Sequence, residues 1–312
     1  MAADAGTTLN PASAAPPLDP RAAPVDDTVA YAIRPFKAAD WPEARRMLVQ
    51  GYPCTPPQLW DAGFQRLAAV PPSAGDPALG VMLEHHERVV GVALMIPSSR
   101  PGGPASAPRV NASSWAITPE ARGRALWMAR HTMADPATAY TALTPIPSAA
   151  KLLQRIGFKP VSHQCILAFT PRLRQAAGAT ARVLAGGEAL AALRDDPLAG
   201  ALDDHLRLGC LVTAVDTGRA LVPMVWRPQR RLKLMRTAEL LYTPSQSTVV
   251  DHLGALARRL LTLGYPMLAF EAHEDLVPEF PCTRLFQRRL ARGPYPAQGV
   301  DHLYSELVYL HR

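Results

Sequence analysis

Several short stretches in the N-terminal half of this chain are predicted to be β-strands, either because apolar and polar residues alternate, as in Val29–Phe36, or because a short apolar run is bounded by polar residues. These stretches are Val29–Phe36, Val81–Leu83, Val89–Ile96, Val110–Ile117, Thr138–Leu143 and Gln164–Phe169. Polar residues 84–88 join the second stretch to the third, which predicts a hairpin.

Helices are predicted between these strands. One helix is predicted to begin at Asp40-Trp41-Pro42-Glu43, which supplies a cap, an early proline and a first-turn carboxylate. A second is predicted over Pro57 to Ala69. A third follows Thr118 as its N-cap. A fourth has apolar residues at helical spacing and is expected to stop at Gly157 in a left-handed cap.

The same order of elements recurs in the C-terminal half. Two strands, Cys210–Val215 and Ala220–Trp226, predict a hairpin, and a strand over Leu232–Tyr242 follows. That strand ends in Thr243-Pro244, as the earlier one ends in Thr118-Pro119. The repeat predicts an α/β fold with two tandem units, each a mixed, mostly antiparallel sheet flanked by helices. Chance is the alternative, because such orders are common.

Composition and the repeat together predict three segments along the chain: a tail and two units. Residues 1–27 are rich in alanine and proline and lack an apolar periodicity, so we expect a disordered tail. The two units are then assigned to residues 28–171 and 182–312, with a short connector between them. Because the connector is short, we expect the halves to fold as one interlocked unit.

Composition indicates where the protein is located and which classes of partner it can bind, but it says little about its activity. The four cysteines have no CxxC spacing, and no apolar run is long enough to cross a bilayer, so we expect a cytoplasmic protein without a membrane partner. The net charge of +7 favours anionic partners in general. The densest basic cluster is expected to be a solvated connection between strands, and nucleic acid is an unlikely partner because no recognition motif accompanies it. Its members are Arg227, Arg230, Arg231, Lys233 and Arg236.

The clearest candidate site is the strand–turn–helix segment that contains Arg122-Gly123-Arg124-Ala125. A strand that leads into a helix N-terminus presents backbone N–H groups, which bind phosphate well. This segment, together with the terminal Gly157-Phe158, resembles the GCN5-related N-acetyltransferase superfamily. The superfamily's pyrophosphate motif is Gln/Arg-x-x-Gly-x-Gly/Ala. Here Arg122 takes the first position, Ala125 replaces the first glycine and Trp127 stands at the last small position, where it would have to turn outward.

The resemblance implies acyl-CoA or acetyl-CoA as co-substrate, with no metal. It places the acyl-CoA contacts at six residues: Ile117, Thr118, Arg122, Gly123, Arg124 and Ala125. It also implies that backbone N–H groups around Ala116 and Ile117 polarise the thioester. Ser114 lies on that strand, where it can relay or position a proton.

Many relatives carry a tyrosine acid on the helix before the Gly-Phe pair, and here that register holds Leu153. Tyr140 and Ser148 could substitute, with a structural role as the favoured alternative for each, and Tyr140 is the one assigned. Ser114 and Tyr140 are therefore the candidate catalytic residues. Glu239, on the matching strand of the second half, is either an active-site carboxylate or an edge-facing charge, with the latter favoured.

The resemblance implies transfer of an acyl group from acyl-CoA to an amine or hydroxyl acceptor, small molecule or peptide, by direct attack on the thioester. The alternative is a non-catalytic binding or scaffold protein on the same fold, because Ala125, Trp127 and Leu153 all depart from the superfamily's pattern. Neither the acceptor, the acyl chain length nor the oligomeric state follows from the sequence.

Overall fold

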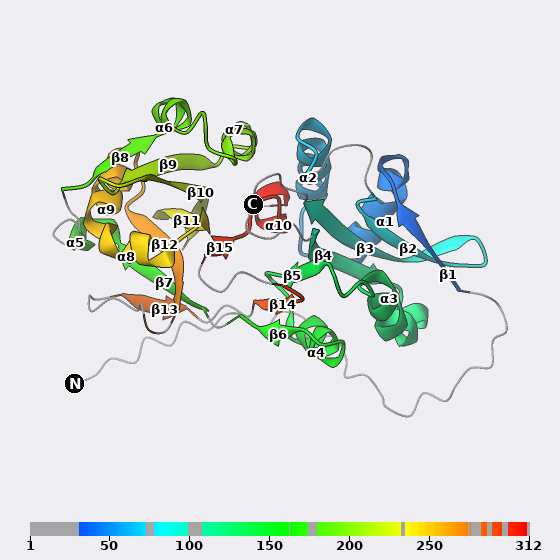
Figure 1. Ribbon diagram of the computed structural model, residues 1–312. Coiled ribbons are helices and arrows are strands. Elements are labelled where there is room, and N and C mark those ends of the chain that lie inside the picture. Colours follow the sequence, from blue (N-terminus) through cyan, green and yellow to red (C-terminus); the bar gives the residue numbers. More distant parts are fainter. Residues whose placement is uncertain are drawn as a thin grey trace. The chain divides into compact units, whose positions relative to one another are not determined.

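Two β-sheets flanked by helices make up the computed structural model of the chain (Figure 1). It describes residues 31–72, 78–98, 108–161, 163–173, 180–231, 235–273, 275, 282–285, 289–294 and 299–310. The predicted tail, residues 1–27, lies outside these ranges, as does most of the predicted connector. The assignment of units to residues 28–171 and 182–312 stays a prediction.

The first sheet has the strand order β1-β2-β3-β4-β5-β14-β6. Neighbouring strands are antiparallel except for β4 and β5, which are parallel. The strands are β1 (Ala32–Phe36), β2 (Gly80–His85), β3 (Arg88–Ser98), β4 (Arg109–Ile117), β5 (Ala139–Ala142), β6 (Lys159–Pro160) and β14 (Leu290–Arg292).

The second sheet has the order β13-β7-β12-β11-β10-β9-β8, and β15 pairs with β11 outside this path. Again one neighbouring pair, β11 and β12, is parallel and the others are antiparallel. The strands are β7 (His163–Phe169), β8 (Arg182–Ala185), β9 (Leu211–Asp216), β10 (Leu221–Arg231), β11 (Met235–Thr243), β12 (Met267–His273), β13 (Thr283–Leu285) and β15 (Val300–Asp301).

The two sheets repeat one topology, as the sequence predicted. In each, four antiparallel strands lead through helices to a fifth strand that is parallel to the fourth. The sheets also exchange strands. β14, from the C-terminal half, lies between β5 and β6, whereas β7, from the N-terminal half, lies between β12 and β13. Each sheet is therefore completed by a strand from the other half of the chain.

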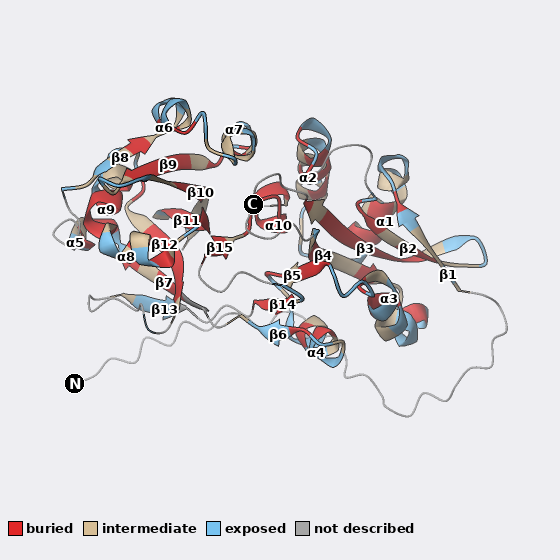
Figure 2. Cartoon of the chain, viewed as in Figure 1, coloured by how far each residue is buried: buried red, intermediate tan, exposed pale blue. Residues whose placement is uncertain are grey.

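Helices follow the strands in both halves, and Figure 2 shows that their buried sides face the sheets. The helices are α1 (Trp41–Gly51), α2 (Pro57–Ala69), α3 (Ala125–Thr132), α4 (Pro147–Arg155), α5 (Thr170–Leu173), α6 (Gly187–Ala192), α7 (Ala199–Arg207), α8 (Gln246–Asp251), α9 (Leu253–Thr262) and α10 (Glu306–Tyr309). Two 3-10 helices precede α1 and α3, namely η1 (Ala38–Asp40) and η2 (Pro119–Arg124).

Helix ends explain several of these boundaries. Gly157 ends the α4 segment with φ at +96°, a left-handed conformation that favours glycine, and Phe158 N–H donates to the Leu153 carbonyl. Both features confirm the predicted cap. The helix after Thr243-Pro244 begins with Ser245 as its N-cap, whose side chain accepts a hydrogen bond from the Thr248 N–H.

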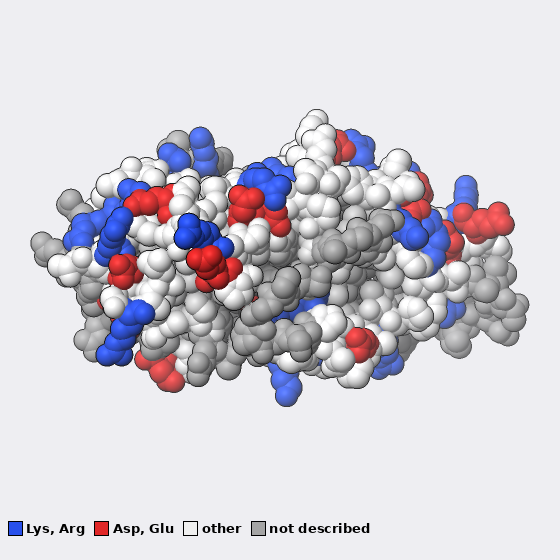
Figure 3. All heavy atoms as spheres, turned by 45° about the horizontal axis from the view of Figure 1, so that its top comes forward, with Lys and Arg blue, Asp and Glu red and all other residues white. Residues whose placement is uncertain are grey.

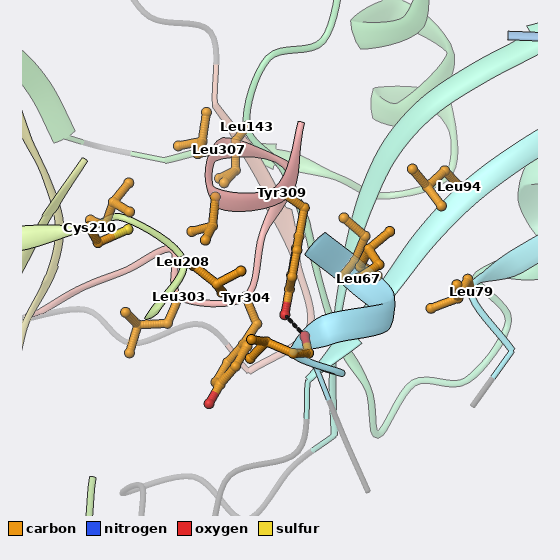
Figure 4. Close-up of a cluster of buried hydrophobic side chains, with 14 of the residues drawn as sticks. Leu67, Leu79, Leu94, Leu143, Leu208, Cys210, Leu303, Tyr304, Leu307 and Tyr309 are labelled. Carbon is orange, nitrogen blue, oxygen red and sulfur yellow. Dashed lines mark hydrogen bonds between the residues drawn. The ribbon is translucent and has the colours of Figure 1, made fainter. Parts of the chain in front are cut away.

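Buried side chains from both halves share one hydrophobic cluster (Figure 4). Leu67 and Leu94 come from α2 and β3, whereas Cys210 precedes β9. Tyr309 of α10 is fully buried among them, and its hydroxyl donates to the Val70 carbonyl at 2.9 Å. Burial of this shared apolar surface stabilises the two halves together, because apolar surface removed from water is the main source of folding free energy.

Candidate active site

The parallel strands β4 and β5 pair only over Arg109–Asn111 and then separate. This leaves an open edge along the second half of β4. Tyr52, which follows α1, reaches this edge. Its hydroxyl donates to the Trp115 carbonyl at 3.1 Å and accepts from the Trp115 N–H at 3.0 Å. Burial raises the pKa of Tyr52, so the phenol stays neutral near pH 7.

A pocket of about 450 Å³ lies beside this open edge. Its volume falls in the range of small-molecule sites in proteins. Both halves contribute to it: α2 and β4 from the first, β10 and α10 from the second. The lining residues are Tyr52, Thr55, Leu59, Trp60, Ser113, Ser114, Thr144, Arg227, Gln229, Arg230, Glu306, Leu307 and Leu310.

Glu306, the first residue of α10, places a carboxyl group in this pocket. The Thr144 hydroxyl donates to Glu306 Oε1 at 2.6 Å, and the Glu306 N–H donates to Asn111 Oδ1 at 2.8 Å. Asn111 is the last residue of β4 that pairs with β5, so Glu306 is fixed where the two strands part. Burial raises the pKa of Glu306, because the low-dielectric interior disfavours the charged form.

The pocket also borders a buried ionic network in the second half. Arg227 forms an ion pair with Glu239, and its Nη1 donates to the Leu307 carbonyl at 3.2 Å. Arg289 bridges Glu239 to Glu271, and Glu271 lies 3.0 Å from His302 Nε2. Burial opposes ionisation of Glu239, yet the Arg227 and Arg289 guanidinium groups outweigh it and lower its pKa.

This network corrects one sequence expectation and part of another. Glu239 is 2% exposed, so the interpretation as an edge-facing charge is wrong. The basic cluster lies mainly on two strands, and Arg227 is largely buried in its ion pair with Glu239, whereas Arg230 and Arg236 are exposed as expected. Arg227, Arg230 and Arg231 lie on β10 and Arg236 lies on β11, with its guanidinium over the Tyr265 ring. Lys233 lies outside the described residues. On the face in Figure 3, cationic and anionic side chains are interspersed.

The two candidate catalytic residues lie in different environments. Ser114 lines the pocket. Tyr140 is 4% exposed and packs in the cluster that contains Met133 and Leu153. The structure therefore does not bring Tyr140 and Ser114 into one site. Ser148, the other substitute considered, is exposed at the start of α4.

The predicted phosphate turn is the 3-10 helix η2, which continues into α3. Arg122, Gly123 and Arg124 are exposed, and the space above Gly123 is open. Two backbone donors at this turn are used within it, because Ala121 N–H donates to the Thr118 carbonyl at 3.1 Å and Ala125 N–H donates to the Arg122 carbonyl. The exposed arginines of the turn are accessible to a phosphate.

Two residues that depart from the superfamily's pattern, Trp127 and Leu153, lie where their size and apolar character lead us to expect them. Trp127 is 41% exposed and faces outward, as expected for a bulky residue at a position that is normally small. Leu153 is 5% exposed and belongs to the core. Arg124 stacks over the Tyr31 ring at 4.7 Å from its centroid, which orders this guanidinium beside the turn.

In the second half, the corresponding gap is filled by the chain itself. β11 and β12 pair over Thr237–Glu239, and beyond this point β15 pairs with Tyr242 and Thr243 of β11. The open edge that β4 presents is therefore covered on β11. Among the residues that the structure describes, the separated strands of the first unit adjoin the 450 Å³ pocket.

Sequence reasoning missed Tyr52 and Glu306. Tyr52 lies 63 positions from its partner Trp115, and Glu306 lies 195 positions from Asn111, with no spacing that links either residue to β4. A carboxylate in the mostly apolar run Leu303–Leu310 was the one signal for Glu306. Among the described residues, no cluster of His, Cys, Asp and Glu has the arrangement of a metal site, and no helix is long and apolar enough to span a membrane.

Solved structures share this architecture. A GCN5-related N-acetyltransferase from Anabaena variabilis matches with a TM-score of 0.57 over 84% of this chain and 72% of that chain, at 12% identity. Another from Kribbella flavida matches with a TM-score of 0.52 over 85% and 71%, at 11% identity. No protein-family model and no curated protein matches the sequence.

The chain therefore has the fold of the GCN5-related N-acetyltransferases, as its sequence resemblance implied. It is an α/β protein with two mostly antiparallel sheets that repeat one topology. Because one fold supports many reactions, activity has to be argued from the pocket.

Proposed function

We propose that this protein is an acyltransferase that moves an acyl group from acyl-CoA to an amine or hydroxyl acceptor held in the 450 Å³ pocket. The observation that carries the proposal is the separation of β4 from β5 beside a pocket that contains Ser114 and Glu306. In the reaction, the acceptor atom attacks the thioester carbonyl. The new C–N or C–O bond replaces the C–S bond, and the acceptor's proton balances the thiolate that leaves.

Within this proposal, Arg122 and Arg124 contact the CoA phosphates, with the other predicted contacts at Ile117, Thr118, Gly123 and Ala125. Exposed guanidinium groups suit this role, because charge-assisted hydrogen bonds to phosphate are strong. Ser114 positions the acceptor from the pocket wall. Tyr140 stays the proposed proton donor to the thiolate only if the thioester sulfur approaches β5. A cytoplasmic location is part of the proposal, and four free cysteines support it.

Calorimetric titration with acetyl-CoA and longer acyl-CoAs tests this proposal, followed by thiol release with a panel of amines and alcohols. We expect saturable binding and release of free CoA that depends on the acceptor. Absence of binding to every acyl-CoA would contradict it.

One observation favours the non-catalytic alternative. The Tyr52 hydroxyl bonds both backbone groups of Trp115 on the open edge of β4, next to Ala116 and Ile117, whose N–H groups the resemblance assigns to polarising the thioester. A binding protein with this fold would retain the pocket and bind amines without turning over acyl-CoA. Amine binding combined with no CoA release would support that alternative.

A further inference from the structure

The C-terminal segment, residues 300–310, belongs structurally to both halves. Its first residues form β15 on β11, and His302 N–H donates to the Leu241 carbonyl at 2.8 Å. Its last residues form α10, where Arg66 Nη1 donates to the Tyr309 carbonyl at 2.9 Å. In Figure 1 this segment is drawn in red, from β15 to α10. It therefore carries Glu306 from the second sheet to the open edge of β4.

Glu306 is held at a defined position there. Its backbone N–H is bonded to Asn111, and Asn111 Nδ2 donates in turn to the Thr141 carbonyl at 3.3 Å. These bonds tie α10 to the last paired residues of β4 and β5. Thr144, just after β5, donates to one carboxyl oxygen. Among the described residues that line the pocket, Glu306 is the one carboxylic acid.

We propose that Glu306 is the catalytic base of the acyl transfer, a proposal that rests on the proposed function. As the acceptor attacks the thioester carbonyl, its N–H or O–H proton moves to the Glu306 carboxylate. The new bond to the acyl carbon forms, the C–S bond breaks, and the electron pair stays on sulfur. Glu306 then returns its proton to water, and the thiolate takes one either from water or from Tyr140, which water reprotonates, so protons and electrons balance.

The surroundings of Glu306 suit a base that works near neutral pH. Burial strengthens its basicity, because it raises the pKa of the carboxyl. Arg227 and Arg230 line the same pocket from β10, and Arg289 acts on Glu306 from further away; their charges favour the carboxylate. Tyr52 is the other titratable group beside it and is neutral, since burial raises its pKa.

A purely structural role is the competing explanation, because the carboxyl group accepts a bond from Thr144. Glu306→Gln separates the two roles. The amide keeps an oxygen that accepts from Thr144 and keeps the side-chain volume, but it cannot take a proton. Glu188→Gln is the matched control, since it makes the same change at an exposed carboxylate far along the chain on α6.

The experiment measures kcat/KM for acetyl-CoA and a responsive amine from about pH 5 to about pH 10, together with acetyl-CoA affinity and thermal unfolding. For Glu306→Gln we expect turnover to fall by about 10²–10⁴-fold, the usual contribution of a general base. The acidic limb of the pH profile should disappear. Acetyl-CoA affinity and Tm should stay at their wild-type values. Glu188→Gln should match the wild type.

Two results would overturn the assignment: an active Glu306→Gln with an unchanged pH profile, or a loss of rate matched by a loss of fold. An inactive wild-type protein with every acceptor would instead contradict the proposed function. The two failures are thus distinguishable. If the wild-type protein is inactive with every acceptor, there is no acyl transfer in which Glu306 can act as base, and the base assignment is then wrong as well.

Discussion

Arg109 on β4 forms an ion pair with Asp301 on β15, across 192 positions of sequence. Their side chains are 17% and 9% exposed, so the pair is largely buried. β4 belongs to the first sheet and β15 to the second. The pair fixes the C-terminal segment just before Glu306 reaches the pocket.

Breaking this pair should destabilise the whole protein. Asp301→Asn leaves the Arg109 guanidinium buried without its charge partner, and we expect a loss of about 3–5 kcal/mol in the free energy of unfolding. Urea denaturation measures it. Arg194→Gln is the control, because its pair with Asp195 is exposed and should contribute at most about 1 kcal/mol. Equal effects of the two variants would show that the buried pair is not structural.

Separated halves should not fold. Residues 1–173 lack β14, and residues 182–312 lack β7, so each isolated sheet would lack one of its inner strands and expose an unpaired edge. We expect each fragment alone to be insoluble or without protected amides in hydrogen exchange, whereas co-expressed fragments should form a soluble complex. Two fragments that each melt cooperatively would contradict this expectation.

Binding of acyl-CoA should depend on the exposed arginines of η2. Replacing Arg122 and Arg124 by Ala removes charge-assisted hydrogen bonds to phosphate, and each one should weaken binding by about 1.5–3 kcal/mol. Calorimetry measures it. Arg130→Ala, at an exposed arginine on α3, removes one positive charge, as each single replacement does, without altering the turn. If that control weakens binding as much, the effect is general electrostatics; if a folded double variant binds normally, the CoA site lies elsewhere.

Tyr52→Phe should show whether the Tyr52 hydroxyl blocks the binding of the thioester at the open edge of β4. The variant frees the N–H and carbonyl of Trp115, which the Tyr52 hydroxyl now bonds, and keeps the ring's packing against Trp60. If this hydroxyl competes with the thioester, acetyl-CoA affinity should rise. An unchanged affinity, measured by calorimetry at the same pH, would place the thioester away from Trp115.

Stability should fall in acid because of Glu239. Its pKa is held below the ordinary value of 4.5, so its ionised form stabilises the folded state at neutral pH, and this stabilisation is lost as pH falls below 4.5 through the folded pKa. Glu239→Gln should lose about 3–5 kcal/mol at neutral pH. The difference from wild type should shrink as the pH is lowered from about 5 to about 3. A difference independent of pH would mean that packing, rather than charge, accounts for it.

His302 adds a separate acid-sensitive window. Burial lowers its pKa from 6.5, so the unfolded state takes up a proton at a higher pH than the folded state, and folded-state stability falls as pH drops below 6.5. As the pH is lowered, the loss of folding stability due to His302 therefore begins at a higher pH than the loss due to Glu239.

Local signals in the sequence determined the elements and their repetition. Short apolar runs bounded by polar residues predicted β2, β3 and β9, and the glycine at position 157 predicted the end of the α4 segment, because these features depend on a residue and its near neighbours. The Thr118-Pro119 and Thr243-Pro244 pairs revealed the two repeated units for the same reason.

Only the tertiary structure decided which residues meet. The exchange of β7 and β14, the burial of Glu239 and the arrival of Glu306 beside Ser113 all arise from pairings between residues far apart in sequence. No periodicity encodes such contacts. The sequence favoured an exposed charge at Glu239 because its partner Arg289 lies 50 positions away, and a charge is buried only where the fold supplies that partner. Local sequence patterns indicated many of the strands and helices of this protein but not β14, β15 or α10, and long-range packing decided where its candidate site lies.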